Sequence, residues 1–163
     1  MAEPHHVRKF VRLEPIDGGV QFEAVLAIDS HEDDSWPRTK MKSQVDDNDK
    51  RLIVAKETNG NVVGFMAYTV GVRTIYLNRI VVGVNHRRQE IGTQLLEFCI
   101  KALRHYTKRC IQAYVPEANL AAQLFLRECG FFTVPPYVSP NFFHQGENAY
   151  LFEFREAVLA SAR

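Results

Sequence analysis

The 163-residue chain lacks the features that mark membrane, secreted and metal-binding proteins. No apolar run approaches the roughly 20 residues that a membrane-spanning helix needs, and residues 1–6 carry no apolar stretch typical of a signal peptide. The three cysteines, Cys99, Cys110 and Cys129, lie far apart, without the spacing of a disulfide framework or a metal site. We therefore expect a reduced, cytoplasmic protein with no metal ion and no membrane partner. Cys99, on the apolar face of a helix, is expected to be a buried free thiol.

The chain also lacks an excess of either charge, since its formal net charge is only +1. Nucleic-acid-binding proteins ordinarily carry a clear basic surplus, so nothing in this balance indicates a nucleic-acid partner. Hydrophobic residues make up 46% of the chain and charged residues 24%, which is the composition of a globular protein. With no internal repeat or linker, the length fits a single domain over residues 1–163, as a monomer or a homodimer.

The apolar periodicity predicts a single mixed α/β sheet with the element order β-α-α-β-β-β-α-β-α-β-β. Asn59-Gly60, between two apolar runs, is typical of a tight hairpin. Ser35 is a candidate cap for the second helix, and Gly130 is a candidate C-terminal cap for the last one. The predicted strands cover residues 7–13, 51–57, 61–70, 72–82, 110–115, 131–138 and 149–154, and the predicted helices cover residues 20–28, 36–45, 91–106 and 119–129.

The most informative segment is Arg87-Arg88-Gln89-Glu90-Ile91-Gly92-Thr93, which joins an apolar strand to an amphipathic helix. A helix that starts shortly after a strand leaves several backbone N–H groups unpaired. Together with the helix dipole, these groups form a site for a phosphate or pyrophosphate. Such junctions are common, so a plain connection between the two elements explains this segment equally well when it is taken alone.

Three blocks along the chain resemble the GNAT superfamily, the acetyl-CoA-dependent N-acetyltransferases. Residues 87–92 are similar to the family's pyrophosphate loop, Q/R-x-x-G-x-G/A, and residues 119–131 are similar to its N-x-x-A-x-x-L-Y…G-F block. Asn141-Phe142-Phe143…Gly146-Glu147-Asn148-Ala149 resembles the N-Y-Y…G-E-D-A segment of the RimI-like branch, the protein N-terminal acetyltransferases. The blocks cover nearly the whole chain in the right order. They imply the GNAT fold, with a splayed central sheet.

The resemblance implies that acetyl-CoA binds as a co-substrate. In the family, the fourth strand grips acetyl-CoA through its backbone, and loop amides hold the diphosphate. An asparagine bonds the pantetheine arm, which enters between the splayed fourth and fifth strands, here residues 77–82 and 110–115. The matching residues of this chain are Ile80, Val81, Val82, Arg87, Arg88, Gln89, Glu90, Ile91, Gly92, Thr93, Asn119 and Phe125. Asn119 is also a candidate helix N-cap.

Three residues depart from the family pattern. Glu90 replaces the first glycine of the loop, which removes easy access to a positive φ and places a carboxylate near the diphosphate. Phe125 stands where the family has the tyrosine that protonates the departing thiolate, and phenylalanine has no proton to donate. Tyr114 stands where RimI-like enzymes carry a glutamate that assists amine deprotonation, so its hydroxyl is a candidate proton relay.

The resemblance also points to residues around the acceptor amine. They are Trp36, Phe142, Phe143 and Glu147. Each has a simpler interpretation: Trp36 packs in the core, one of the two phenylalanines packs in the core, and Glu147 is a solvated surface residue. His86 and His144 are likewise most simply solvated surface residues. The acidic segments 31–34 and 46–49 are most simply solvated loops, because they lack the glycine and terminal glutamate of a calcium loop. The alternative is that these acidic segments attract a cationic acceptor.

These features predict an acetyl-CoA-dependent N-acetyltransferase acting on a primary amine, most simply the N-terminal α-amine of a protein or peptide. An α-amine, with a pKa of about 7.7–8.0, is partly uncharged near neutral pH, whereas a lysine, near 10.4, needs a base far more. Two alternatives stay open: acetylation of a small-molecule amine, and a catalytically weak acyl-CoA-binding sensor or partner module. The choice of acceptor lies in variable loops, which the sequence does not resolve.

Overall fold

The computed structural model describes residues 7–140, 142–143 and 146–157. Their elements follow the order expected from the sequence. The bounds are β1 (Arg12–Pro15), α1 (Gly18–Asp29), α2 (Arg38–Asp46), β2 (Lys50–Lys56), β3 (Val62–Val70), β4 (Thr74–Val82), the 3₁₀ turn η1 (Val84–His86), α3 (Ile91–His105), β5 (Cys110–Pro116), α4 (Leu120–Glu128), β6 (Phe132–Thr133) and β7 (Ala149–Phe154). Asn141 and His144, which the sequence analysis singled out, lie outside the described residues.

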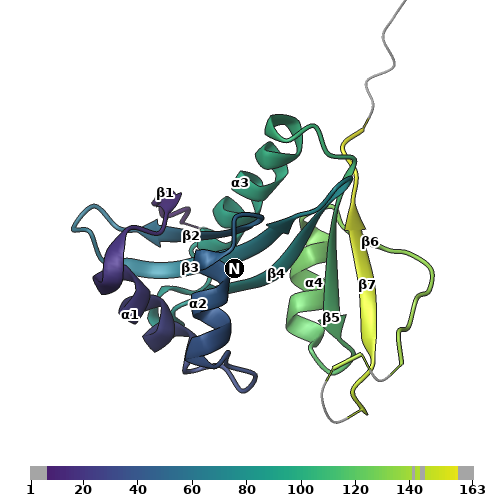
Figure 1. The fold of residues 1–163 in the computed structure, drawn as a ribbon, viewed down its shortest axis with the longest axis horizontal. Coiled ribbons are helices and arrows are strands. Elements are labelled where there is room, and N and C mark those ends of the chain that lie inside the picture. The colour runs from purple at the N-terminus through teal and green to yellow at the C-terminus, as the bar shows by residue number, and fades with distance from the viewer. Residues whose placement is uncertain (1–6, 141, 144–145, 158–163) are drawn as a thin grey trace, which may run out of the picture.

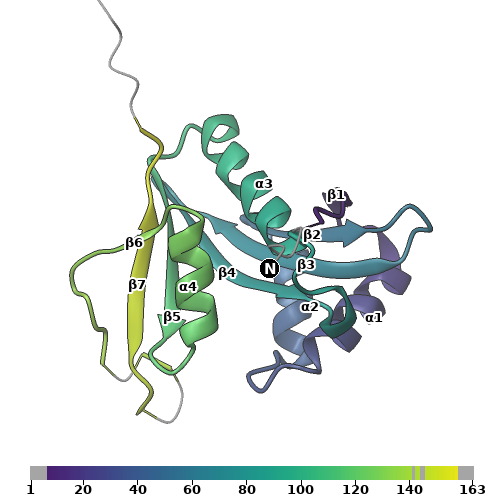
Figure 2. The same ribbon diagram turned by 180° about the vertical axis from the view of Figure 1, so that it is seen from behind.

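The strands form one mixed sheet in the order β1-β2-β3-β4-β5-β7-β6. Strands β4 and β5 are parallel, and the other neighbouring pairs in the described chain are antiparallel. Helices α1 and α2 cover one face of the sheet, and α3 and α4 cover the other (Figures 1 and 2). The mixed α/β architecture predicted from the apolar pattern is confirmed.

Each face of the sheet has its own apolar core, and β2 contributes to both. Ile53 and Ala55 of β2 belong to the core beneath α3 and α4, whereas Leu52 and Val54 belong to the core beneath α1 and α2. Successive side chains of a strand point to opposite faces, so a continuous apolar run is needed where both faces are covered. The run from Leu52 to Ala55 meets that need.

Several local predictions are confirmed. Gly60 takes φ +88° in the β2–β3 hairpin, and Gly130 takes φ +91° just after α4. All three cysteines are free, and burial raises the pKa of the Cys99 thiol to about 12. Within the described part of the chain, no helix is long and apolar enough to cross a membrane.

Three boundaries differ from the prediction. The first strand starts at Arg12 because residues 7–11 run beside α3 instead, where Lys9 N–H donates to Gln89 O. Ser35 does not cap α2: the N-cap is Pro37, and no side chain caps it. The strand expected over residues 131–138 is paired only at β6, since the following residues include Pro135 and Pro136, which have no N–H for a ladder.

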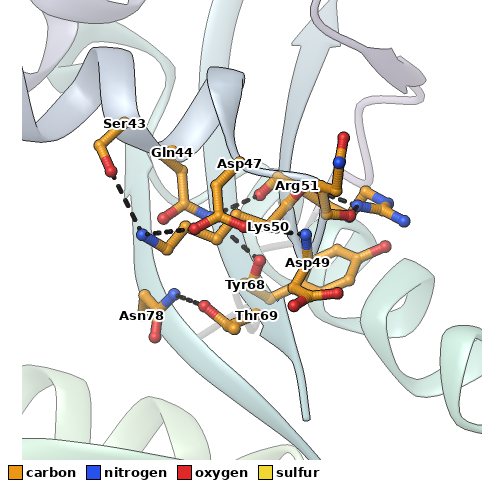
Figure 3. A network of polar contacts seen from close by, with 10 residues as sticks. Ser43, Gln44, Asp47, Asp49, Lys50, Arg51, Tyr68, Thr69 and Asn78 are labelled. Atoms are coloured by element: carbon orange, nitrogen blue, oxygen red, sulfur yellow. Dashed lines mark hydrogen bonds and ion pairs between the residues drawn. The ribbon is translucent and has the colours of Figure 1, made fainter.

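A buried glutamine ties α2 to the sheet (Figure 3). The Gln44 Nε2 amide donates 3.0 Å hydrogen bonds to two backbone carbonyls, those of Arg51 on β2 and Tyr68 on β3. The Gln44 side chain is only 3% exposed. A buried carbonyl left without its partner costs free energy, so this amide contributes to the stability of the α2–sheet contact.

We therefore expect Gln44→Met to lower the free energy of unfolding by about 1–3 kcal/mol, because both carbonyls lose a donor while the volume is kept. Urea denaturation followed by circular dichroism measures this change. Lys42→Met, on the exposed side of the same helix, is the control and should change the free energy by less than about 0.5 kcal/mol. If both substitutions change the free energy of unfolding equally, the Gln44 hydrogen bonds contribute nothing to stability.

Candidate active site

The most unusual feature of the sheet is that β4 and β5 separate part-way along their length. Their parallel pairing joins Thr74 to Cys110 and ends at Tyr76 and Gln112. Beyond that point, β4 stays paired with β3 as far as Val82, and β5 stays paired with β7 as far as Pro116. Each strand therefore presents one edge without a strand partner in the described structure, and Figure 1 shows the two strands fanning apart. The splay expected from the sequence is present.

A bulge in β4 lies where this separation begins. Leu77 pairs with Tyr68 and Arg79 pairs with Ala67, so Asn78 is an extra residue on β4. A bulge bends its strand and increases the local twist. It thus turns the second half of β4 away from β5 while the β3 ladder continues.

The segment between β4 and α3 keeps a glycine-like conformation without the glycine. Glu90, the N-cap of α3, takes φ +58° and ψ +22°, and Arg88 takes φ +60°. Replacing the glycine by glutamate thus removes the easy access to a positive φ but not the conformation itself. For a residue with a Cβ, the left-handed conformation costs about 1–2 kcal/mol, so contacts around the loop must hold it.

Arg87 holds the loop from the side of α1. Its Nε donates to Val82 O at 3.2 Å, and its guanidinium lies 2.6 Å from the Glu32 carboxylate. The acidic segment 31–34 is therefore not simply solvated. Asp34 also has a partner, Arg79, at 3.1 Å. His86, just before Arg87, lies 3.8 Å from Glu57.

Phe125 of α4 lies against the first turn of α3. A Cβ built on Gly92 would lie 3.4 Å from Phe125 Cζ and 3.8 Å from a methyl of Val82. The Phe125 ring thus lies over the first turn of α3 at Gly92, which is itself close to Val82 at the end of β4. At the start of α4, Asn119 caps the helix as predicted, with Oδ1 accepting from Ala122 N–H at 3.1 Å.

An aromatic group stands on the opposite face of β5. Tyr114 is 37% exposed and stacks on Phe142, with ring centroids 4.1 Å apart and an angle of 14°. Phe143 meets Phe142 edge-on at 5.0 Å, and its N–H donates to Glu147 O. Phe142 is 46% exposed, so it is not the phenylalanine of this pair that packs in the core. Four of the predicted site residues, Tyr114, Phe142, Phe143 and Glu147, are thus brought together.

Trp36 belongs to a different cluster. It packs on the core beneath α1 and α2, with Lys40 Nζ 4.4 Å and Arg79 Cζ 5.4 Å from its ring. This packing favours the core-packing interpretation, and a contact of Trp36 with the acceptor stays a prediction. Burial, and then the charge of Arg79, lower the pKa of Lys40.

An ion pair that was not predicted from the sequence anchors this cluster. Asp29, at the end of α1, pairs with Arg79 on β4 and also accepts from Trp36 N–H at 2.6 Å. The two ionised side chains are 1% and 8% exposed. The available signal was an arginine within an apolar strand and an aspartate ending an apolar helix, since buried charges need partners. No cluster of three or more His, Cys, Asp or Glu side chains suited to a metal occurs in the described part of the chain.

These features can now be compared with known proteins. A family model described as "Acetyltransferase (GNAT) family" matches residues 22–131, more than half of the chain. The chain belongs to this family. It is therefore an acyltransferase of the EC 2.3.1 class, in a family that uses acyl-CoA. The matched region includes the separating strands, the loop before α3 and Phe125.

Solved structures show the same fold at low identity. The ribosomal-protein-S18-alanine N-acetyltransferase from Escherichia coli is 19% identical, with a TM-score of 0.77 over 90% of this chain and 94% of that one. Ard1 from Thermoplasma volcanium is 17% identical, with a TM-score of 0.78 over 89% and 97%. An aminoglycoside 6'-N-acetyltransferase with coenzyme A is 14% identical, with a TM-score of 0.71 over 88% and 96%. A search of curated sequences gave no match. The names of these structures cover different acceptors, so the likeness shows the fold alone.

The left-handed loop leads to a stability prediction. Glu90→Gly relieves a strain of about 1–2 kcal/mol but adds about 0.5–1 kcal/mol of unfolded-state entropy, so the free energy of unfolding should rise by roughly 0.5–1 kcal/mol. Glu90→Ala removes the same carboxylate but keeps the strain, and should give no such gain. Urea denaturation of the two variants decides between backbone strain and charge: equal stabilisation by alanine would mean that the carboxylate, not φ, is unfavourable.

Proposed function

We propose that this GNAT protein transfers the acetyl group of acetyl-CoA to the N-terminal α-amine of a protein or peptide. The observation that carries the proposal is the pair of unpartnered edges on β4 and β5, beside the start of α3. Backbone N–H and C=O groups away from water need hydrogen-bond partners. The amides of a pantetheine arm supply such partners much as a strand would. The loop before α3 supplies free N–H groups and the positive end of a helix dipole for the diphosphate.

Each part of the site then has a role in binding. The backbone of Ile80, Val81 and Val82 bonds the pantetheine arm, and the amides of residues 87–93 bond the diphosphate. Asn119 uses its Oδ1 for the helix cap, but an amide side chain also carries two N–H donors, which can reach the pantetheine arm. Phe125, against Gly92 and Val82, forms an apolar wall beside this path.

The charges near the end of α1 favour a peptide over a polycation. Three carboxylates at and just after that end already have basic partners: Glu32 pairs with Arg87, and Asp29 and Asp34 pair with Arg79. An aminoglycoside or polyamine carries several positive charges and needs several carboxylates that have no other basic partner. A peptide presents a single α-amine and needs fewer. Tyr114 and Phe142 instead offer an aromatic surface suited to the first side chains of a peptide.

The chemistry follows from these positions. The uncharged amine attacks the thioester carbonyl carbon, and a β4 backbone N–H stabilises the oxyanion that forms. The tetrahedral intermediate then expels the thiolate, the new amide nitrogen loses a proton, and the sulfur gains one. Phe125 cannot supply that proton, so water or the Tyr114 hydroxyl relays it. A general acid contributes about 10²–10⁴-fold, so turnover is expected to be slow.

One observation favours a second candidate, an acyl-CoA-binding module that has lost catalysis. Phe125 has no acidic proton, and Tyr114 replaces the glutamate of the RimI-like pattern. Such a protein would bind acetyl-CoA and release no CoA with any amine. The binding geometry is the same for both functions, so only turnover separates them.

A panel of acceptors tests the proposal. With acetyl-CoA, we expect CoA release with peptides that carry a free N-terminus, and none with the same peptides acetylated at the N-terminus, which keep their lysines as the control. The rate should rise with pH and level off above about pH 9, where an α-amine with a pKa of about 7.7–8.0 is almost fully deprotonated. Turnover of aminoglycosides or polyamines alone would identify the small-molecule alternative, and binding without turnover would identify the acyl-CoA-binding module.

The missing acid gives a separate prediction. Phe125→Tyr places a phenol where the family has one, and should raise kcat about tenfold or more, with little change in the KM for acetyl-CoA. Phe132→Tyr, which adds the same hydroxyl to an exposed ring on β6, is the control and should leave kcat unchanged. If Phe125→Tyr folds normally without a gain in kcat, then another group already protonates the thiolate.

A further inference from the structure

Residues 7–11, which we call the N-terminal strap, lie against the loop before α3. Lys9 N–H donates to Gln89 O at 3.1 Å. Further along the strap, Val11 N–H donates to Gln94 Oε1 at 3.3 Å. At the exposed edge of the strap, Arg8 pairs with Glu97 on α3 at 2.8 Å. The strap thus contacts both the loop and the first turns of α3.

Gln94 joins the strap to the loop through one buried amide group. Its Nε2 donates to Lys9 O at 2.7 Å and to Glu90 O at 3.2 Å. The Glu90 carbonyl also accepts the first helical bond of α3, from Gln94 N–H at 3.1 Å. The Gln94 side chain is 7% exposed, so water does not readily replace these bonds. The orientation of the Glu90 peptide is therefore fixed by Gln94 and, through it, by the strap.

The loop needs such support because its conformation is unfavourable by itself. Arg88 and Glu90 both take positive φ, at +60° and +58°, and neither is glycine. The buried Gln89 Oε1 has no hydrogen-bond partner in the described part of the chain. Strained backbone persists only where the surrounding structure over-determines it. A glycine at position 90 would hold the same φ without help.

We propose that Gln94 is a positioning residue, which together with the N-terminal strap holds Glu90 in the left-handed conformation that the acyl-CoA diphosphate site requires. The proposal rests on the proposed function for the identity of the ligand. It assigns to Gln94 and the strap the role that a glycine fills elsewhere in the family. Loss of the strap contact therefore weakens acyl-CoA binding without touching the reacting atoms.

The test compares two buried glutamines on helices. Gln94→Met keeps the volume of the side chain, removes its bonds to Lys9 O and Glu90 O, and also removes the acceptor of Val11 N–H in the strap. Gln44→Met, in α2, likewise removes two bonds to backbone carbonyls but lies away from the loop. Releasing one left-handed residue corresponds to about a tenfold change in affinity. We expect Gln94→Met to raise the Kd for CoA, measured by calorimetry, and the KM for acetyl-CoA by about that factor, with kcat unchanged, and Gln44→Met to alter none of them.

Rescue by glycine separates positioning from general destabilisation. In a Glu90→Gly background, the left-handed conformation no longer needs support, so Gln94→Met should change the Kd for CoA by less than about twofold. An undiminished tenfold loss in that background would overturn the proposal. So would a wild-type affinity in Gln94→Met alone.

A second pair of variants tests the strap without altering the core. Lys9→Pro removes the N–H that bonds Gln89 O, and Lys9→Ala removes only the side chain that pairs with Glu57. Hydrogen exchange of the amides of residues 88–91 in ligand-free protein should speed up in Lys9→Pro and in Gln94→Met, and not in Lys9→Ala. If the exchange rates in Lys9→Pro and Gln94→Met equal those of the wild type, the strap does not hold the loop. If wild-type protein fails to bind CoA, the proposed function fails, while this comparison still decides whether the strap holds the loop.

Discussion

The parallel pairing of β4 with β5, which stops at Tyr76 and Gln112, is the constraint on which the rest of the site depends. Each strand keeps its other neighbour, so the separation does not unravel the sheet. The bulge at Asn78 bends β4 away, and a buried ion pair between Arg79 and Asp29 fixes the bulged segment to α1. The opening is thus built into a rigid scaffold, which is how a site keeps its geometry without a ligand.

Two of the residues that differ from the family pattern, Glu90 and Phe125, lie around this opening. The shape of the site is kept at both positions, but the proton donor is lost at Phe125. Glu90 keeps a left-handed φ because Gln94 holds its carbonyl. Phe125 fills the position of the usual acid with a ring of nearly the same shape, so packing against Gly92 is kept while proton donation is lost. Orientation of the two reactants contributes more to many reactions than a single acid does. A slow enzyme therefore remains consistent with this site.

The sequence predicted what depends on local periodicity and failed where tertiary contacts decide. The order of elements, the hairpin at Gly60 and the cap at Asn119 follow from apolar spacing and turn chemistry, and the structure has them. Ser35 was a reasonable cap, but Asp29, six residues earlier, takes the Trp36 N–H instead. The left-handed conformation of Glu90 could not be predicted, because propensity alone disfavours it and the bonds around it include a residue distant in the chain, Lys9. Roles of side chains toward acetyl-CoA came from the family pattern and not from periodicity.

The central claim, that the open edges of β4 and β5 receive the pantetheine arm, is tested most directly by hydrogen exchange of those edges. Backbone amides of residues 77–82 and 113–115 should exchange more slowly when acetyl-CoA is added, because partners from the pantetheine arm replace water. Desulfo-CoA should give the same protection, and adenosine 3',5'-bisphosphate, which lacks the arm, should not. Protection confined to residues 87–93, or none in either strand at saturating acetyl-CoA, would contradict the account.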